Sequence, residues 1–223
     1  MPTITRLERQ KRNKERVNVY LDGDFAFGLA ALDAAMLRKG QQLEEVEITR
    51  LKQQDAVVQA FDHAVQLLAR RPRSIQEIRD RLRRKGREEA VIDAAIDRLK
   101  ERAYVDDHAF ARYWVENRSN FKPMGARALR YELRRKGVSA AIIDTVLTEM
   151  LDESVEDAAA YQAAQGRVRS LRGQPRRVFQ QKMGAFLQRR GFPFDVCRRV
   201  IDQLISELES SEEEFFAPDE ATD

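Results

Sequence analysis

The sequence RLRRKG at residues 81–86 returns almost unchanged as ELRRKG at 132–137, and FLQRRG at 186–191 is a more divergent third copy. In each copy a glycine follows directly on a run of cations. Glycine just past a helix can adopt the left-handed conformation of a C-cap. Cations in the last turn interact favourably with the negative end of the helix dipole. Each copy is therefore predicted to be the end of a helix.

A second helix is predicted after each glycine. Counted from Gly86, Gly137 and Gly191, the positions 5, 6, 9, 10 and 13 residues downstream are apolar in all three copies, which is the spacing of one helix face. These residues are Val91, Ile92, Ala95, Ile96 and Leu99; Ile142, Ile143, Val146, Leu147 and Met150; and Val196, Cys197, Val200, Ile201 and Leu204.

A third helix precedes each basic segment, clearly at residues 60–71 and 107–119 and more weakly at 155–172. Ser74 and Glu77 form a capping box between the first two helices of the first copy. Each copy is thus a three-helix unit of about 50 residues, and such units bury their apolar faces by stacking on neighbours. The predicted fold is mainly α, with tandem three-helix repeats in an elongated, curved array.

The two ends of the chain differ from the repeats. The segment VNVYLDGDFAFGL (17–29) alternates around Asp22-Gly23 and predicts a β-hairpin, to which residues 3–10 add a possible third strand. Helices are expected at 29–37 and 46–61. The predicted domains are a head at 1–54, repeats at 55–105, 106–153 and 154–209, and an acidic disordered tail at 210–223.

The formal net charge of +3 hides an asymmetry. Residues 207–223 hold eight acids and no base, so residues 1–206 carry 40 bases against 29 acids. A basic body favours a polyanionic partner, with nucleic acid the first candidate.

The sequence lacks the patterns of common catalytic and metal sites. There is no GxxxxGK[ST], GxGxxG or HExxH motif, and the two histidines, His63 and His108, lie far apart. Cys197 falls on an apolar helix face, where a buried, unreactive thiol is the expected state. His63 is expected to be structural or exposed. We expect a non-enzymatic protein with no metal and no cofactor. No apolar run is long enough for a membrane span and no secretory signal is found, which predicts a cytoplasmic protein.

The order of these motifs resembles the RecX family of bacterial regulatory proteins. The residues that carry the resemblance are AVQLLARRPRSIQEI (64–78), LRRKGREEAVIDAAIDRLKERAYVDDHAFA (82–111) and KPMGARALRYELRRKGVSAAII (122–143). The chain departs from the family pattern at Ala103, where glycine is expected, and in the weak start of its third repeat. The resemblance implies tandem three-helix repeats and a partner, the RecA recombinase filament on single-stranded DNA. It implies a negative regulator that limits the growth, ATPase and strand exchange of that filament. We expect this protein to be a monomer.

The basic helix ends are the predicted contact surface for the filament and, more weakly, for single-stranded DNA. Stacked units would repeat these ends at regular steps. The residues at these ends are Arg83, Arg84, Lys85, Arg130, Arg134, Arg135, Lys136, Arg189 and Arg190, and the segment 112–127 adds Arg112, Arg118, Lys122 and Arg127 to the second unit.

Other interpretations of the same residues stay open. Cations near a helix C-terminus can simply compensate its dipole. Phe110, Tyr113 and Trp114 lie among arginines and can stack on bases, but Phe110 and Trp114 are better explained as core or packing residues, and Tyr104 as part of a joint between repeats. The tail can solubilise the chain or compete for its basic face. The protein can also be a nucleic-acid-binding module that acts without RecA, or a helical scaffold for an unrelated partner.

Overall fold

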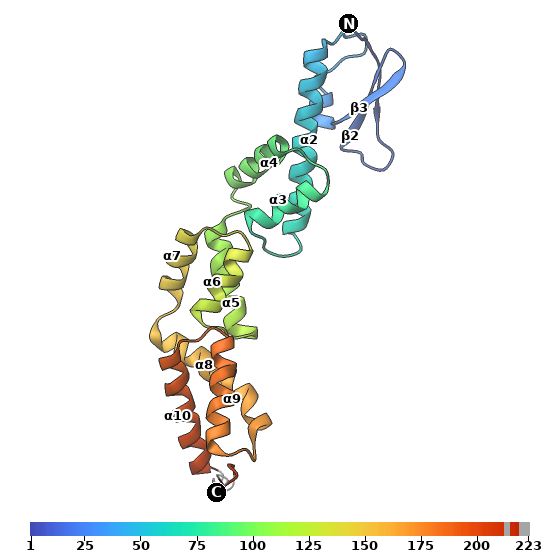
Figure 1. The fold of residues 1–223 in the computed structure, drawn as a ribbon. Coiled ribbons are helices and arrows are strands. Elements are labelled where there is room, and N and C mark those ends of the chain that lie inside the picture. Colours follow the sequence, from blue (N-terminus) through green and yellow to red (C-terminus); the bar gives the residue numbers. More distant parts are fainter. Residues whose placement is uncertain (212–214, 219–223) are drawn as a thin grey trace. The chain divides into compact units, whose positions relative to one another are not determined.

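A computed structural model describes residues 1–211 and 215–218 (Figure 1). The chain divides into two compact units, Met1–Val105 and Asp106–Asp223. Each unit has its own set of helices, and the strands belong to the first.

The first unit opens with a three-stranded antiparallel sheet in the order β1-β2-β3. The strands are β1 (Ile4–Arg9), β2 (Arg16–Leu21) and β3 (Asp24–Ala30). Asp22 and Gly23 both have positive φ, at 50° and 101°, as a two-residue hairpin turn with the twist of its strands requires. The predicted hairpin and third strand are therefore confirmed. The helix expected at 29–37 is only the single turn α1 (Ala31–Ala34).

One long helix joins the sheet to the first repeat. Helix α2 (Glu45–Leu68) packs on β3 with its first half and on α3 (Ile75–Arg84) and α4 (Glu89–Glu101) with its second half. In Figure 1 it leaves the sheet and continues into the first three-helix repeat without a break. The separate helices expected at 46–61 and 60–71 are thus one helix. The head–repeat boundary placed at 54–55 falls inside it, because no glycine or proline interrupts α2.

The second unit contains two further three-helix repeats. Helices α5 (Asp107–Phe121), α6 (Ala126–Arg135) and α7 (Ala140–Met150) form the first of these. Helices α8 (Glu153–Val168), α9 (Arg176–Arg189) and α10 (Phe194–Ser211) form the second, with a short 3-10 helix η1 (Arg169–Leu171) after α8. The mainly helical class, the tandem repeats and the small sheet are as predicted.

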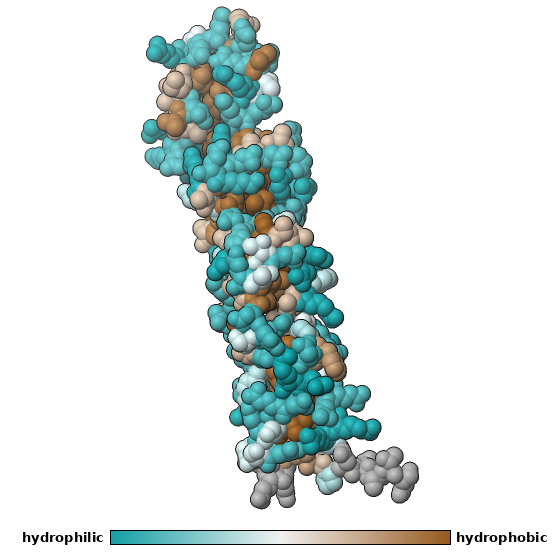
Figure 2. Space-filling view, turned by 90° about the vertical axis from the view of Figure 1, so that its left-hand side faces the viewer, coloured by the Kyte–Doolittle hydropathy of each residue, from teal (hydrophilic) through white to brown (hydrophobic). Residues whose placement is uncertain are grey.

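Each repeat has its own hydrophobic core, built from the positions that the spacing singled out. Twelve of the fifteen predicted apolar positions are buried, and Val91, Ile142 and Met150 are half-buried at the edges. Cys197 is 2% exposed, and burial raises the pKa of its thiol. In Figure 2 hydrophilic residues cover most of the visible surface, and hydrophobic ones show as smaller patches among them.

The three predicted helix ends have one backbone geometry. Gly86, Gly137 and Gly191 have φ of 74°, 79° and 88°. In each case the amide of the residue after the glycine donates to the carbonyl of the buried leucine five residues earlier, at 3.2 Å. This pattern is a Schellman C-cap. The three copies can therefore be compared position by position around this cap.

The repeats of the second unit meet at a close backbone contact. The Gly125 amide donates to the Arg190 carbonyl at 3.0 Å, and the Ala126 amide donates to Glu156 Oε1 at 3.0 Å. A Cβ added at Gly125 would lie 2.4 Å from the Gly191 carbonyl oxygen. A side chain at Gly125 would therefore push these two repeats apart.

The tail differs from the prediction of disorder from residue 210. Helix α10 continues to Ser211, and Phe215 is 3% exposed and packs edge-on against Phe179 at 6.0 Å between ring centroids. The Gly173 amide donates to the Phe215 carbonyl at 2.9 Å. The sequence prediction missed this contact because the many acidic residues around Phe215 and Phe216 are typical of a disordered segment. Residues 212–214 and 219–223 of the predicted tail lie outside the described residues.

Candidate functional site

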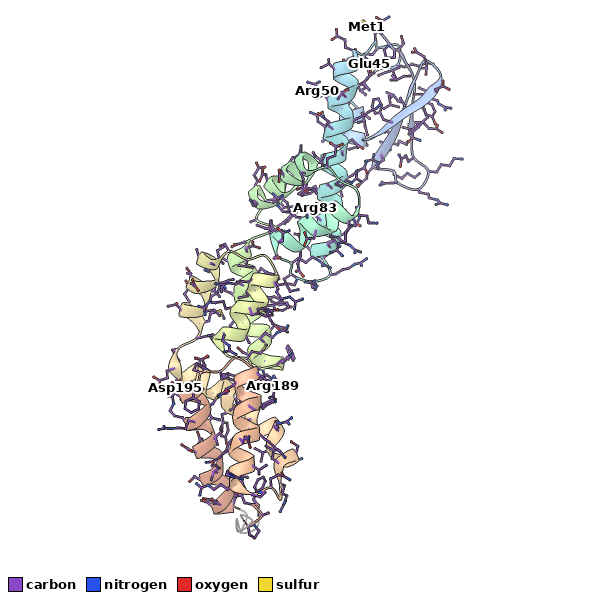
Figure 3. The ribbon with its side chains drawn as sticks, in the orientation of Figure 1. Met1, Glu45, Arg50, Arg83, Arg189 and Asp195 are labelled. Atoms are coloured by element: carbon purple, nitrogen blue, oxygen red, sulfur yellow. The ribbon has the colours of Figure 1, made fainter. Side chains whose placement is uncertain are left out.

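Several predicted site residues make ion pairs within their own repeat. Such pairs lower the charge that these arginines offer to a partner. They are Arg83 with Asp80 and Glu89, Arg112 with Glu149, and Arg130 with Asp144, at nitrogen–oxygen distances between 2.6 and 3.0 Å. Figure 3 marks Arg83 near the end of α3. Arg84 also bonds internally, with its Nε donating to the Asp80 carbonyl at 3.2 Å.

Two further predicted residues belong to a network around the only tryptophan. Trp114 Nε1 and Arg118 Nε both donate to Glu132 Oε2, at 2.9 and 2.7 Å. The Arg118 guanidinium and the Lys136 ammonium lie 4.3 and 4.7 Å from the Trp114 ring centroid. Partial burial opposes ionisation of Glu132, but the hydrogen bonds from Arg118 and Trp114 outweigh it and lower the pKa of this carboxyl. The network connects α5 to α6, so Arg118 and Lys136 have a structural role within the repeat. That they also contact a partner stays a prediction.

The outer face of α6 combines cations with an exposed aromatic ring. Arg127, Tyr131, Arg134 and Arg135 lie at positions i, i+4, i+7 and i+8, which share one side of a helix. We call these four residues the cation–aromatic face. Tyr131 is 63% exposed, and the Arg135 guanidinium lies 5.8 Å from its ring centroid. The one acid of α6, Glu132, points into the Trp114 network. Within the described part of the chain no acid pairs with Arg127 or Arg134.

Sequence reasoning missed Tyr131. It considered Phe110, Tyr113 and Trp114 on the preceding helix, of which Phe110 is confirmed as core at 3% exposure. The signal that could have identified Tyr131 is the helical periodicity of α6. Leu129 and Leu133 define the buried side, which places residues 127, 131 and 134 on the opposite side.

Three more predicted residues lie near the contact between the repeats of the second unit. Lys122 is exposed just after α5, and Arg189 is exposed at the end of α9 (Figure 3). Arg190 instead donates from Nη1 to the Pro123 carbonyl at 3.2 Å and covers the Phe186 ring at 5.0 Å. It therefore holds the two repeats together.

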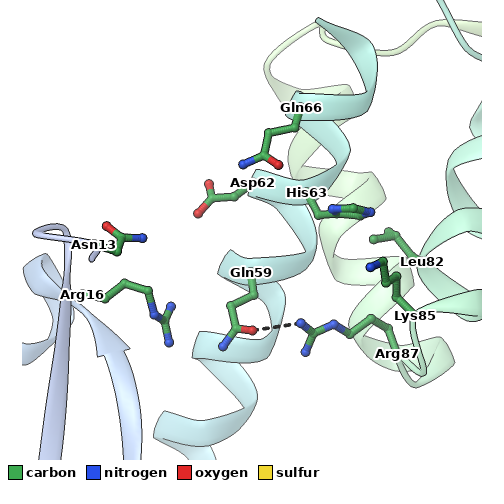
Figure 4. Close-up of a pocket in the computed structure, with 9 residues that line it drawn as sticks. All are labelled: Asn13, Arg16, Gln59, Asp62, His63, Gln66, Leu82, Lys85 and Arg87. Carbon is green, nitrogen blue, oxygen red and sulfur yellow. Dashed lines mark hydrogen bonds between the residues drawn. The ribbon is translucent and has the colours of Figure 1, made fainter. Parts of the chain in front are cut away.

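Lys85, the remaining predicted residue, lines a polar pocket of about 410 Å³ in the first unit. The pocket lies between the loop before β2, the middle of α2 and the cap after α3 (Figure 4). Beside it, Arg16 donates twice to the carboxylate of Asp55, at 2.9 and 2.8 Å, and Asp55 is 4% exposed. The predictions did not include this pocket because it forms only where the head and the first repeat meet.

The described residues contain no group of three or more His, Cys, Asp or Glu side chains placed to hold a metal ion. Among the described helices, none is both long enough and apolar enough to cross a membrane.

These features define a class: a helical-repeat protein with three three-helix units, each with its own core, behind a small antiparallel sheet. Models of the RecX family match these parts in the same order. The regulatory protein RecX N-terminal domain matches residues 2–44, and the first, second and third RecX three-helix domains match residues 60–99, 106–147 and 155–201. The chain belongs to the RecX family.

Named relatives support this assignment. The regulatory protein RecX of Clostridium botulinum (strain Eklund 17B / Type B) is 34% identical over 212 residues, covering 92% of this chain and 98% of the relative. That of Bacillus subtilis (strain 168) is 32% identical over 217 residues, covering 96% and 80%. These relatives are named as regulatory proteins and not as enzymes.

Solved structures agree with the fold. A crystal structure of regulatory protein RecX superposes with a TM-score of 0.74 at 29% identity, covering 91% of this chain and all of that one. The crystal structure of RecX from Lactobacillus salivarius has a TM-score of 0.62 at 22% identity over 68% of this chain, which supports the fold alone.

Proposed function

We propose that this protein is a non-enzymatic, cytoplasmic negative regulator of the RecA recombinase, which binds as a monomer to the RecA filament on single-stranded DNA and limits its growth, ATPase and strand exchange. Membership of the RecX family supports regulation of RecA. The basic helix ends support an acidic or polyanionic partner.

The observation that carries the proposal is the cation–aromatic face of α6. Tyr131 is 63% exposed and lies between arginines that pair with no acid among the described residues, so the ring does little for the stability of its own repeat. The same arrangement suits a single strand, since arginines neutralise phosphates and a flat ring stacks on an unpaired base. Stacking on one base contributes about 1–3 kcal/mol in such sites.

The test removes this charge and leaves the internal pairs in place. Arg127, Arg134 and Arg135 are changed together to glutamine, and RecA ATPase on single-stranded DNA is measured across a range of regulator concentrations. We expect the concentration for half inhibition to rise at least tenfold, because three charge-assisted hydrogen bonds are removed. The matched control removes three exposed cations of the head, Lys14, Arg38 and Lys39. It should inhibit like the original chain.

Two outcomes separate the alternatives. If added single-stranded DNA relieves the inhibition in proportion to the amount of this protein that the DNA binds, the protein acts by sequestering DNA without contacting RecA. If the triple variant inhibits as well as the control, the cation–aromatic face is a solvated surface and the proposal fails at this site. The salt dependence of DNA binding gives a second readout, because its slope falls by about 0.7 for each phosphate of a single strand that the variant no longer neutralises.

A further inference from the structure

The polar pocket beside Lys85 lies where the second repeat has an apolar corner. The shared Schellman cap aligns the two repeats, so that each residue of the first repeat corresponds to the residue 51 positions later in the second. Gln59, His63 and Arg87 of the first repeat correspond to Phe110, Trp114 and Val138 of the second. Phe110 and Val138 are 3% and 4% exposed, so the second repeat fills this corner with core side chains. In the third repeat the counterpart of Arg87 is Phe192, also 4% exposed.

The first repeat therefore replaces packing with hydrogen-bonding groups at this corner. Because Gln59, His63 and Arg87 fill less of it with apolar groups, the site is open as a pocket of about 410 Å³. Figure 4 shows the three side chains reaching from α2 and from the cap toward the same space, with Lys85 beside His63. Polar side chains at a core position stabilise a repeat less than the apolar side chains that the other repeats have there.

The donors of the pocket outnumber its acceptors. Arg87 uses one guanidinium nitrogen on Gln59 Oε1, at 2.9 Å, and a guanidinium has five N–H groups. The Lys85 ammonium is exposed. His63 Nε2 is buried and has no hydrogen-bond partner among the described residues. One acid, Asp62, lines the same pocket and opposes an anion. Arg16 is not counted among the free donors, because both of its Nη atoms already donate to the Asp55 carboxylate.

The electrostatics of His63 agree with an anion site. Burial lowers the pKa of this imidazole most, followed by the positive charges of Lys85, at the C-cap of α3, and of Arg81, within α3. Arg87 and Arg70 act in the same direction, from the cap and from the end of α2. Four cations thus raise the potential at one ring. An anion placed among them would offset that potential and bring the pKa of His63 back up.

We propose that this pocket binds a phosphate group, held by Lys85, Arg87 and the His63 ring. The group can come from free phosphate or from the backbone of a nucleic-acid strand, since both present the same oxygens to these donors. The pocket belongs to the first unit and the cation–aromatic face to the second, and phosphate binding requires neither that face nor RecA. It is therefore an addition to the proposed function.

The two histidines of the chain make the test direct. The imidazole resonances of His63 and His108 are followed by NMR in the full-length protein while inorganic phosphate is added at constant ionic strength and pH, with chloride as the balancing salt. We expect saturable movement of His63 and none of His108, which lies on α5 beside Glu149. Movement of His63 that does not saturate, or that chloride alone reproduces, overturns the proposal.

Variants locate the binding to the pocket. Lys85→Gln should weaken phosphate about tenfold, as expected for removal of one charged hydrogen bond. Asp62→Asn should tighten it by removing the opposing charge. Lys39→Gln, an exposed change in the same unit, is the matched control and should leave the affinity unchanged. Equal affinities for all three variants would overturn the assignment, and so would an equal saturable response to acetate, since that would indicate a carboxylate site.

A last arm distinguishes the two sources of phosphate. A short oligothymidylate that moves His63 and is displaced by inorganic phosphate identifies the strand backbone as the ligand. Movement of His63 with inorganic phosphate alone identifies the free anion. Because RecA is absent from every arm, failure here leaves the proposed regulation of the filament untouched. Loss of inhibition in the α6 triple variant, conversely, says nothing against the pocket.

Discussion

Replacing Gly191 by alanine should destabilise the second unit far more than the same change at Gly86 destabilises the first. The two glycines have the same backbone role, with φ of 88° and 74° in equivalent Schellman caps. An alanine in the left-handed region costs about 1–2 kcal/mol, so this part of the effect is shared. The difference lies in the surroundings.

At Gly86 an added Cβ meets nothing within 4 Å. At Gly191 it would lie 2.5 Å from both the Cβ and the backbone nitrogen of Ala128, on the helix of the neighbouring repeat. Forced overpacking of this kind costs about 1–3 kcal/mol. We therefore expect Gly191→Ala to lower the free energy of unfolding by about 2–5 kcal/mol, and Gly86→Ala by about 1–2 kcal/mol.

Urea unfolding measures both values. The only tryptophan, Trp114, lies in the same unit as Gly191 and reports its unfolding by fluorescence, while circular dichroism follows the helices of the whole chain. With a slope of about 2 kcal/mol per molar urea, a destabilisation of about 3 kcal/mol lowers the Trp114 midpoint by roughly 1.5 M. If Gly191→Ala is no more destabilising than Gly86→Ala, the close approach of Gly191 to Ala128 is refuted.

Three further changes test other parts of the structure. Asp55→Ala should cost about 3–5 kcal/mol because it strands the Arg16 charge in a mostly buried position, whereas the double change Arg16→Met with Asp55→Leu should cost less, as measured by urea unfolding. The pKa of His63 is lowered in the folded chain from an ordinary value of 6.5, so unfolded chains bind more protons below that pH. Stability should accordingly be complete above pH 6.5 and fall as the pH drops through 6.5 toward the folded pKa, and His63→Gln should flatten this part of the profile. Phe215→Ala should release the segment that covers Phe179 and speed hydrogen exchange of the Gly173 amide at least tenfold, while a Gly173 exchange rate equal to that of the original chain would argue against the contact.

The sequence predicted well those features that depend on local pattern. The helix faces follow from 3.6-residue periodicity, the caps from glycine after a cationic run, and the hairpin from Asp22-Gly23. Each of these signals lies within a few residues of the structure that it specifies.

Features that depend on tertiary contacts were harder to predict. Whether Arg112 or Arg130 faces a partner or pairs with an acid is decided by residues 37 and 14 positions away. The polar pocket needs the head and the first repeat together, and neither segment shows it alone. Phe215 was assigned to the tail because charge dominates its neighbourhood, whereas its buried ring and its hydrogen bond to the Gly173 amide place it against the third repeat.

The continuity of α2 restricts how the length of the chain can change at this point. Its first half packs on the sheet through Ile48 and Leu51, and its second half enters the core of the first repeat through Ala60 and Ala64. Inserting one residue between Leu51 and Ala60 would turn everything beyond it by about 100° and separate the sheet-facing side from the repeat-facing side. An insertion of about seven residues, close to two full turns, would restore the phase while lengthening the helix by about 10 Å. Viable insertions and deletions in this stretch should therefore come in steps near this length.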